Sequence, residues 1–291
     1  MTEDPFLTHR RLLFTVAYEM HGSAADAEDV LQESWLKWDA VDQSEVRDPR
    51  AYLVRIVTRK ALDRMRTVAR RREEYFGPWL PEPLLTAPDV GEDIELADSL
   101  SMAMLLVLET LAPTERAVFL LRDVFGLGYD ELAEAVGKTP AAVRQIAHRA
   151  REHVAARRPR GTPSQAETRA ALEAFLRALE TGDLQGLADI LAPDVVALGD
   201  GGGVKQALPR PVVGADKVGR LLRHGVAAFR DQGMSAELTY VNGWPALVLR
   251  QGEEVDSVMS VRVEHGLVTA VYTVRNPDKL LGMNTEATFA R

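Results

Sequence analysis

A short stretch near the middle of the chain carries arginines, a glutamine and a histidine at helical spacing. Arg144 and Gln145 have side chains that can read base edges in a DNA major groove, whereas Arg149 and Arg151 suit phosphate contacts. Residues 137–160 hold seven Lys and Arg against one Glu, a net charge of +6 that suits phosphate binding. The pattern predicts a DNA-reading surface made of Thr139, Arg144, Gln145, His148, Arg149 and Arg151.

A second basic stretch lies upstream, where residues 47–72 hold ten Lys and Arg against two Asp, a net charge of +8. This density exceeds what solubility requires, and Trp35, Trp38 and Tyr52 offer rings for base stacking unless they belong to the core. A solvated basic helix is the plainer alternative. We expect a nucleic-acid strand to bind here, through Arg50, Arg55, Arg59, Lys60, Arg64 and Arg66.

Acidic residues precede this basic stretch, and residues 19–46 have a net charge of −7. Asp26, Asp29 and Glu33 recur on one helical face, away from the apolar one. Neither a histidine nor a second carboxylate cluster accompanies them, so the pattern does not indicate a metal site or acid–base catalysis. An acidic face of this kind favours a protein partner.

Catalysis is the alternative from a different functional class, and Asp200, His224, Tyr240 and Trp244 are its candidates in the last third of the chain. No two of them have a spacing diagnostic of a catalytic pair, and His265 falls in a predicted hairpin turn. We therefore expect no catalytic site, no metal and no cofactor. A ligand-sensing pocket in this region is a milder possibility.

The composition excludes several classes of protein. A length of 291 residues suits two domains or three small ones, and the absence of cysteine excludes disulfides and thiol chemistry. The longest apolar run, 102–108, is far shorter than the ~20 residues that span a bilayer, and residues 1–11 do not resemble a secretory signal. We expect a cytoplasmic protein without membrane contact. The net charge of −8 argues against a uniformly basic surface.

Helices must position the acidic and basic faces, and residues 6–72 have helical patterning throughout, with one long helix starting at Asp48. Farther along, residues 129–136 form a short predicted helix that Gly137 ends, and Thr139 caps the next helix. Two helices joined in this way predict a helix-turn-helix.

An acidic, proline-rich segment separates the two helical parts, since residues 73–98 hold eight acids and no base. Within it, the sequence Trp-Leu-Pro-Glu-Pro-Leu at 79–84 places large apolar groups where no helix can form. We expect this segment to dock onto a neighbouring surface.

The patterning changes after residue 163, where two amphipathic helices are followed by a remainder that strands dominate. Asn242-Gly243 and Glu264-His265-Gly266 lie between strand-like runs and predict hairpins. Helices followed by such a meander indicate an α+β domain with a curved antiparallel sheet.

Four stretches resemble known sequences. Residues 26–38 resemble the helix with which bacterial sigma factors bind core RNA polymerase, and residues 50–66 resemble the region of the extracytoplasmic-function (ECF) group that reads and melts the minus-ten element. Residues 111–116 and 128–133 resemble the fourth sigma domain, which reads the minus-thirty-five element. The resemblance implies core RNA polymerase and promoter DNA as partners. It also implies core-binding residues, namely Asp26, Asp29, Gln32, Glu33 and Trp35.

The last third resembles the SnoaL-like, NTF2-like domain fused to one ECF subgroup, the SigJ-like factors. Residues 79–84, the Asp-Gly-Gly-Gly at 200–203 and the Asn-Pro-Asp-Lys-Leu at 276–280 match motifs of that subgroup. In the subgroup a lysine tends to follow the glycines directly, whereas Val204 here precedes Lys205. The resemblance implies regulation in cis, without a separate anti-sigma factor. The implied interdomain residues are Trp79, Leu80, Pro81, Glu82, Pro83, Leu84, Asp200, Gly201, Gly202, Gly203, Asn276, Pro277, Asp278, Lys279 and Leu280.

We therefore expect two all-α sigma domains followed by an α+β domain. The expected parts are a sigma-2-like domain (1–75), an acidic Pro-rich linker (76–99), a sigma-4-like helix-turn-helix domain (100–158) and a SnoaL-like regulatory domain (165–291). The expected function is promoter-specific transcription initiation as an ECF sigma factor. The alternative is a helix-turn-helix regulator with a ligand-binding or catalytic, cyclase- or isomerase-like, C-terminal domain. The acidic helix and the second basic stretch count against it, because a repressor needs only one DNA reader.

Overall fold

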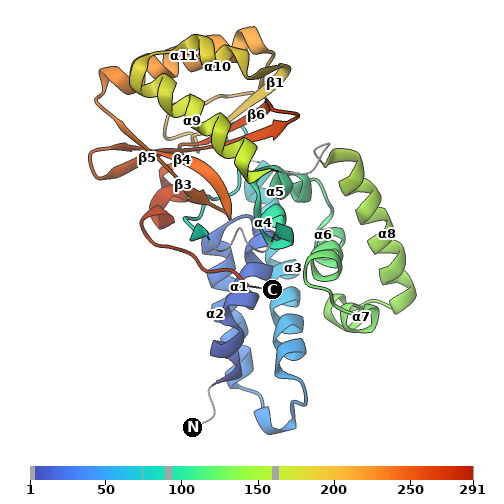
Figure 1. The fold of residues 1–291 in the computed structure, drawn as a ribbon. Helices are drawn as coiled ribbons and strands as arrows, with labels where there is room; N and C mark the ends of the chain where they lie inside the picture. The colour runs from blue at the N-terminus through green and yellow to red at the C-terminus, as the bar shows by residue number, and fades with distance from the viewer. Residues whose placement is uncertain (1–3, 74, 89–93, 159–163, 291) are drawn as a thin grey trace.

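The computed structural model describes residues 4–73, 75–88, 94–158 and 164–290. Part of the predicted linker, residues 89–93, lies outside this description. Helices make up the first half of the chain and a sheet with its own helices makes up the rest (Figure 1).

The N-terminal part is a bundle of helices, as the sequence predicts. Within residues 4–73 they are α1 (Pro5–His21), α2 (Ala24–Asp39), the short 3-10 helix Gln43–Glu45 and α3 (Pro49–Glu73). Side chains cap the α-helices: Asp4 accepts a hydrogen bond from the Phe6 N–H, Ser23 from the Asp26 N–H and Asp48 from the Ala51 N–H. These caps fix the turns between the helices, so the acidic α2 and the basic α3 lie against each other.

The second helical part contains the helix-turn-helix. Its helices are α4 (Ile94–Leu100), α5 (Met102–Glu109), α6 (Pro113–Phe119), α7 (Tyr129–Val136) and α8 (Pro140–Arg157), with a π-helical turn at Leu120–Val124. Gly137 ends α7 in the left-handed conformation (φ 67°), and Thr139 caps α8 by accepting from the Ala142 N–H. The predicted helix-turn-helix is confirmed.

The C-terminal part is the expected α+β domain. Its helices are α9 (Gln165–Thr181), α10 (Leu184–Asp189), α11 (Ala215–Asp231), α12 (Pro277–Leu280) and the 3-10 helix Leu281–Asn284. Its strands are β1 (Leu191–Asp200), β2 (Val212–Val213), β3 (Ser235–Val241), β4 (Trp244–Gln251), β5 (Glu254–Glu264) and β6 (Leu267–Val274). Among residues 164–290 these strands form one open sheet in the order β2-β1-β6-β5-β4-β3.

The sheet is mixed, which corrects one detail of the prediction. Strands β3 to β6 form the antiparallel meander, and the two predicted hairpin turns have positive φ angles at Asn242 and His265. Strand β1, however, runs parallel to β6, because the chain crosses back to the sheet through α11 and the meander before the two strands pair. The long helix α11 lies within the remainder of the chain that strands were expected to dominate.

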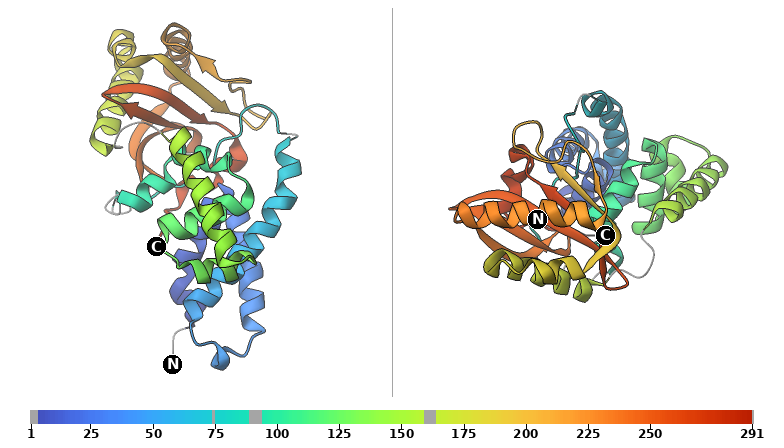
Figure 2. Two further views of the ribbon diagram at one scale, coloured as in Figure 1. Left: turned by 90° about the vertical axis from the view of Figure 1, so that its right-hand side faces the viewer. Right: turned by 90° about the horizontal axis from the view of Figure 1, so that it is seen from above.

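Both faces of the sheet are buried, by different parts of the chain. Helices α9, α10 and α11 cover one face, around Leu172, Phe175 and Leu247 (Figure 2). The other face packs against the linker and α5, through residues such as Leu80 and Met102. The sheet is therefore joined to the helical half by a shared apolar core as well as by the chain.

The last residues return to the N-terminal bundle, and Figure 1 shows the C-terminus beside α1. The Phe289 ring lies 6.0 Å from that of Phe14 and 5.6 Å from that of Tyr18, measured between ring centroids. The Ala290 N–H donates to the Thr15 hydroxyl at 3.0 Å. Phe289 thus packs into the core that α1 forms.

Candidate functional site

The outer face of α2 presents apolar side chains to solvent. Trp35 is 40% exposed and Leu36 is 59% exposed, and Gln32 and Glu33 beside them are exposed too. A solvent-exposed tryptophan next to an exposed leucine is typical of a protein-binding surface. Trp38, by contrast, is buried, so its ring belongs to the core and is not available for base stacking.

The carboxylates of α2 pair with the basic helix α3. Arg64 binds Asp26 through Nε at 2.7 Å and Asp29 through Nη2 at 2.5 Å, and Lys60 binds Glu33 at 3.0 Å. These ion pairs tie α2 to α3. Three of the predicted polymerase-binding acids and two of the predicted DNA-binding cations therefore contact each other within the chain.

Two other basic side chains of α3 contact the helix-turn-helix. Arg55 pairs with the Glu134 carboxylate at 2.9 Å, and Arg59 donates to the Glu134 carbonyl oxygen at 2.7 Å. Arg50 and Arg66 are exposed, and Arg66 pairs with Asp63 one turn away. The surface predicted to read the minus-ten element is thus partly covered by α7.

The predicted reading face of α8 points to solvent. Arg144, Gln145, His148 and Arg149 are exposed, and the Arg144 guanidinium lies 5.4 Å from the Tyr129 ring centroid. Their ion pairs are loose, at 3.5 Å for His148–Glu152 and 3.6 Å for Arg149–Glu115. Arg151 binds Asp123 more tightly, at 2.8 Å, and Thr139 is the helix cap, so both also support the local fold.

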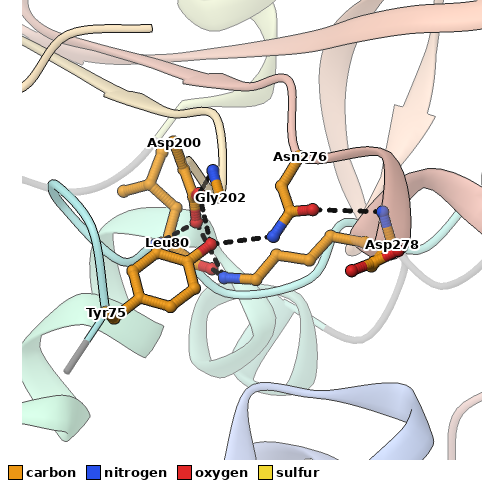
Figure 3. A network of polar contacts seen from close by, with 7 residues as sticks. Tyr75, Leu80, Asp200, Gly202, Asn276 and Asp278 are labelled. Carbon is orange, nitrogen blue, oxygen red and sulfur yellow. Dashed lines mark hydrogen bonds and ion pairs between the residues drawn. The ribbon is translucent and has the colours of Figure 1, made fainter. Parts of the chain in front are cut away.

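The three subgroup motifs meet at Asp200, the last residue of β1 (Figure 3). Its carboxylate accepts hydrogen bonds from the Tyr75 hydroxyl at 2.5 Å, the Leu80 N–H at 2.9 Å and the Gly202 N–H at 3.0 Å. Lys279 completes the set with an ion pair at 2.7 Å. The Asp200 side chain is fully buried, and these donors compensate its charge.

Lys279 also binds the linker. Its Nζ donates to the Leu80 carbonyl oxygen at 2.5 Å and lies 4.1 Å from the Trp79 ring centroid, a cation–π distance. Asn276 donates to the Tyr75 hydroxyl at 2.8 Å and caps α12 at the Asp278 N–H. The interdomain latch, as we name it, consists of Tyr75, Leu80, Asp200, Asn276 and Lys279.

The glycines after Asp200 allow this close approach. Gly202 has φ 62°, and a Cβ on it would lie 2.5 Å from the Asn276 amide. A Cβ on Gly201 would lie 2.0 Å from the Lys205 carbonyl oxygen, and Gly203, also at positive φ, packs against Phe76. Pro277 begins α12 and Leu280 is buried in the interdomain core.

The linker binds the N-terminal bundle as well as the sheet. Glu82 accepts from the Ala24 N–H at 2.8 Å, and its carbonyl oxygen accepts from the Tyr18 hydroxyl at 2.6 Å. Burial raises the pKa of Glu82, although the hydrogen bonds from the start of α2 oppose this. The Leu84 N–H donates to the side-chain oxygen of Asn242, the residue after β3, and the Asn242 N–H donates to the Leu84 carbonyl oxygen, both at 2.9 Å. Pro81, Glu82, Pro83 and Leu84 are all buried between the two parts.

Three side chains of these contacts lie outside the predicted set. Tyr75 and Asn242 belong to the linker contacts above, and the buried Arg116 donates to the Met20 carbonyl at 2.6 Å and pairs with Glu109. Arg116 thereby joins α1 to α6. For Asn242, the only local signal in the sequence was the predicted hairpin turn. Tyr75 and Arg116 have partners far away in sequence that no local pattern reveals.

The candidates for catalysis do not converge. Asp200 belongs to the latch, the Trp244 Nε1–H donates to the Ala97 carbonyl, Tyr240 contacts Arg169, and His224 is exposed on α11. In the part of the chain that the structure describes, no group of three or more His, Asp or Glu is placed to hold a metal ion. No helix among the described residues is long and apolar enough to cross a membrane.

Comparison with known proteins agrees with this geometry. The sigma-70 region 2 family matches residues 6–72, and the sigma-70 region 4 family matches residues 101–154. The chain is 36% identical over 302 residues to the ECF RNA polymerase sigma factor SigJ of Mycobacterium tuberculosis, covering 97% of this chain and 94% of that protein. It is 29% identical over 282 residues to the probable ECF sigma factor SigI of the same organism, covering 96% and 94%.

The whole arrangement has a counterpart among solved structures. The crystal structure of Mycobacterium tuberculosis SigJ superposes with a TM-score of 0.74 at 34% identity, covering 96% of this chain and 98% of that one. Sigma factors bind core RNA polymerase and promoter DNA, and they are generally not enzymes. The chain therefore belongs to the extracytoplasmic-function (ECF) RNA polymerase sigma factors, which serve transcription initiation.

Proposed function

We propose that this sigma factor is regulated in cis, because its C-terminal domain holds the two sigma domains in a compact, restrained arrangement. The observation that carries the proposal is the position of residues 79–84, buried between the start of α2 and the sheet. Residues 79–84 are held on both sides, and Glu134 of α7 binds Arg55 and Arg59 of α3, so the second helical part stays close to the first.

The compact arrangement is unsuited to promoter binding. The minus-ten and minus-thirty-five elements are about 25 base pairs apart, or roughly 85 Å at 3.4 Å per base pair. Helices α3 and α7 are in direct contact. Arg55 and Arg59 bind Glu134 of α7, so these two side chains are not available to DNA in this arrangement. The two parts must separate before α3 and α8 can bind the two elements together.

The predicted surfaces have distinct roles in this proposal. The face of α2 around Trp35 binds core polymerase, α3 contacts the minus-ten element once α7 leaves, and α8 reads the minus-thirty-five element through Arg144 and Gln145. The C-terminal domain takes the role of an anti-sigma factor, so no separate one is required. The protein acts in the cytoplasm by binding, without catalysis of its own.

Transcription with purified core RNA polymerase tests the regulation. We compare the full chain with a chain ending at Arg158, and we include full-length Lys279→Met, which breaks the latch without removing the domain. We expect promoter-specific transcripts from all three and a higher yield from the two altered chains. Equal yields from all three would refute the regulation, and the absence of transcripts from every chain would refute the assignment of the surfaces.

Replacing Trp35 by Ala is expected to weaken binding to core RNA polymerase at least about tenfold, because exposed tryptophans are frequent hot spots of interfaces. The fold should be unaffected, since the ring is already 40% exposed. Surface plasmon resonance with immobilised core polymerase measures the effect. Leu7→Ala, which removes an apolar side chain of α1 that is 60% exposed, is the control. Equal binding by the Trp35 and Leu7 variants would contradict the prediction.

Replacing Gln145 by Ala is expected to relax base preference at one position of the minus-thirty-five element, since a lost base contact costs about 1–3 kcal/mol of discrimination. Transcription from promoters with each base at each position measures it. Arg157→Ala, at the end of α8, should weaken all promoters alike. A uniform loss from the Gln145 variant would show that this side chain does not read a base.

A further inference from the structure

A cavity lies in the C-terminal domain, between its helices and one face of the sheet, and it opens to solvent along α11. Its volume is about 410 Å3, within the range of about 300–1,000 Å3 typical of small-molecule sites. Apolar side chains line most of it, among them Phe175, Leu222, Phe229, Met259 and Val271. The linker and α5 cover the opposite face of the sheet, so the cavity is separate from the interdomain contacts.

One end of the cavity carries an unequal set of charges. Asp256, almost fully buried on β5, accepts a hydrogen bond from Lys205 at 2.9 Å and two from Arg275 at 3.0 and 3.1 Å. Burial would raise the pKa of Asp256, but the hydrogen bonds from Lys205 and Arg275 outweigh burial and lower it. Arg275 also donates to the Gln206 carbonyl oxygen at 2.9 Å. Two cations thus share one carboxylate, and the three groups together carry a charge of +1. Asp256 and Arg275 line the cavity, and Lys205 binds Asp256 from outside the lining.

This combination selects a class of ligand. An apolar molecule gains from the walls of the cavity, and an acidic group on it neutralises the excess positive charge at Arg275. A neutral molecule would make no charge-assisted hydrogen bond with Arg275. We propose that the cavity binds a small amphipathic carboxylic acid in its ionised form, with the carboxylate at Arg275 and the apolar tail between α11 and the sheet.

The same strand ends form the cavity and the interdomain latch. Gly199 and Arg275 line the cavity, and the residues after them, Asp200 and Asn276, belong to the latch. The Arg275 N–H donates to the Asp200 carbonyl oxygen at 2.7 Å. Because Arg275 and Asn276 are adjacent in the chain, directly after β6, a ligand that shifts Arg275 acts on the backbone that positions the latch. Ligand binding therefore changes how firmly the latch restrains the sigma domains. This step rests on the regulation in cis proposed above.

Calorimetric titration of the full chain with octanoate, and with its neutral isostere octanamide, tests the ligand class. We expect octanoate to bind one site at least about tenfold more tightly than octanamide, because only octanoate makes a charge-assisted contact. In Arg275→Gln this preference should fall to less than about threefold. Absence of octanoate binding up to about 10 mM, or equal binding of the two molecules, would overturn the proposal.

Two glycines of α11 provide a matched pair of variants that tests where octanoate binds. Gly225 lines the cavity and Gly219 does not, and a Cβ on either would meet no atom within 4 Å. Gly225→Phe should fill the cavity and reduce octanoate affinity at least about tenfold, whereas Gly219→Phe should retain it. Equal affinities of the two variants would place the octanoate elsewhere and overturn the site.

Transcription with core polymerase separates the binding from its consequence. We expect octanoate to change the transcript yield of the wild type and of Gly219→Phe, but not that of Gly225→Phe. Binding without a change in yield would overturn the coupling to the latch, even if Lys279→Met alters the yield as proposed. If Lys279→Met leaves the yield unchanged, the regulation in cis fails, and the titration alone then decides the ligand site.

Discussion

Replacing Lys279 by Met is expected to lower the free energy of unfolding by about 3 kcal/mol, at the lower end of what breaking a buried ion pair costs. The Asp200 side chain is fully buried and that of Lys279 is 11% exposed, so the variant leaves a carboxylate without its cation. The remaining hydrogen bonds from Tyr75, Leu80 and Gly202 moderate the loss. The cation–π contact with Trp79 is lost as well.

Urea unfolding at pH 7, followed by circular dichroism, measures this loss as a shift of the first transition, since a chain with several domains need not unfold in one step. Hydrogen exchange of the Leu80 amide should accelerate, because that amide donates to Asp200. Lys217→Met, an exposed lysine on α11, is the control and should change stability by less than about 0.5 kcal/mol.

The double variant Asp200→Asn with Lys279→Met separates charge from packing. We expect it to recover part of the stability lost in Lys279→Met, because the amide carries no buried charge that needs a cation. A Lys279→Met chain as stable as the wild type would contradict the assignment of the ion pair to the interdomain contact. A double variant less stable than Lys279→Met would show that the Asp200 carboxylate is favourable even alone.

Local patterns in the sequence predicted the elements whose signals lie within a few residues. The cap at Thr139 and the turn at Gly137 define the helix-turn-helix, and Asn242-Gly243 defines a hairpin, because each depends on backbone preferences of adjacent residues. Helix α11 was missed although Val218, Leu222 and Val226 recur at helical spacing, because the glycines within it lower the intrinsic preference for helix. The parallel pairing of β1 with β6 depends on chain crossover, which no short pattern encodes.

Contacts between distant residues could not be predicted from residue patterns. Tyr75 and Asp200 are 125 positions apart, and Arg55 and Glu134 are 79 apart. The resemblance to a family suggested that the motifs at 79–84, 200–203 and 276–280 act together, but it did not identify Tyr75 as a member. A tyrosine in an acidic linker has no periodic neighbours that would mark it.

The opposite charges of the first 72 residues have a structural consequence. The acidic and basic stretches compensate each other, since Arg64 bridges Asp26 and Asp29, and Lys60 binds Glu33. Part of the basic surface is therefore neutralised in the compact chain. Together with the net charge of −8, this predicts weak DNA binding by the isolated protein.

Replacing Glu19 by Gln is expected to stabilise the protein at alkaline pH, because Glu19 is a fully buried carboxyl group in α1. Its Oε1 accepts a hydrogen bond from the Ser99 hydroxyl of α4 at 2.6 Å. Within the described part of the chain, its Oε2 has no hydrogen-bond partner. Burial raises the pKa of Glu19 to about 8, against the opposing effect of Ser99. The folded chain therefore keeps this group protonated at neutral pH.

The sign of the pH dependence follows from proton binding. Above about pH 4.5 the unfolded chain releases this proton while the folded chain retains it, so the folded state binds more protons. The free energy of unfolding then falls as the pH rises from about 4.5 to about 8, and it changes no further above that. At about 1.4 kcal/mol per pH unit, the total is on the order of 5 kcal/mol.

Glutamine has the shape of the protonated acid but does not ionise, so Glu19→Gln should be about as stable as the wild type at pH 5 and several kcal/mol more stable at pH 8. Urea unfolding of both proteins from pH 5 to pH 9 measures the difference. Glu28→Gln, which changes an exposed carboxylate of α2, is the control and should follow the wild type. Parallel curves for Glu19→Gln and wild type would mean that Glu19 ionises at the same pH in both states. Diverging curves would show that ionisation of Glu19 destabilises the folded chain at alkaline pH.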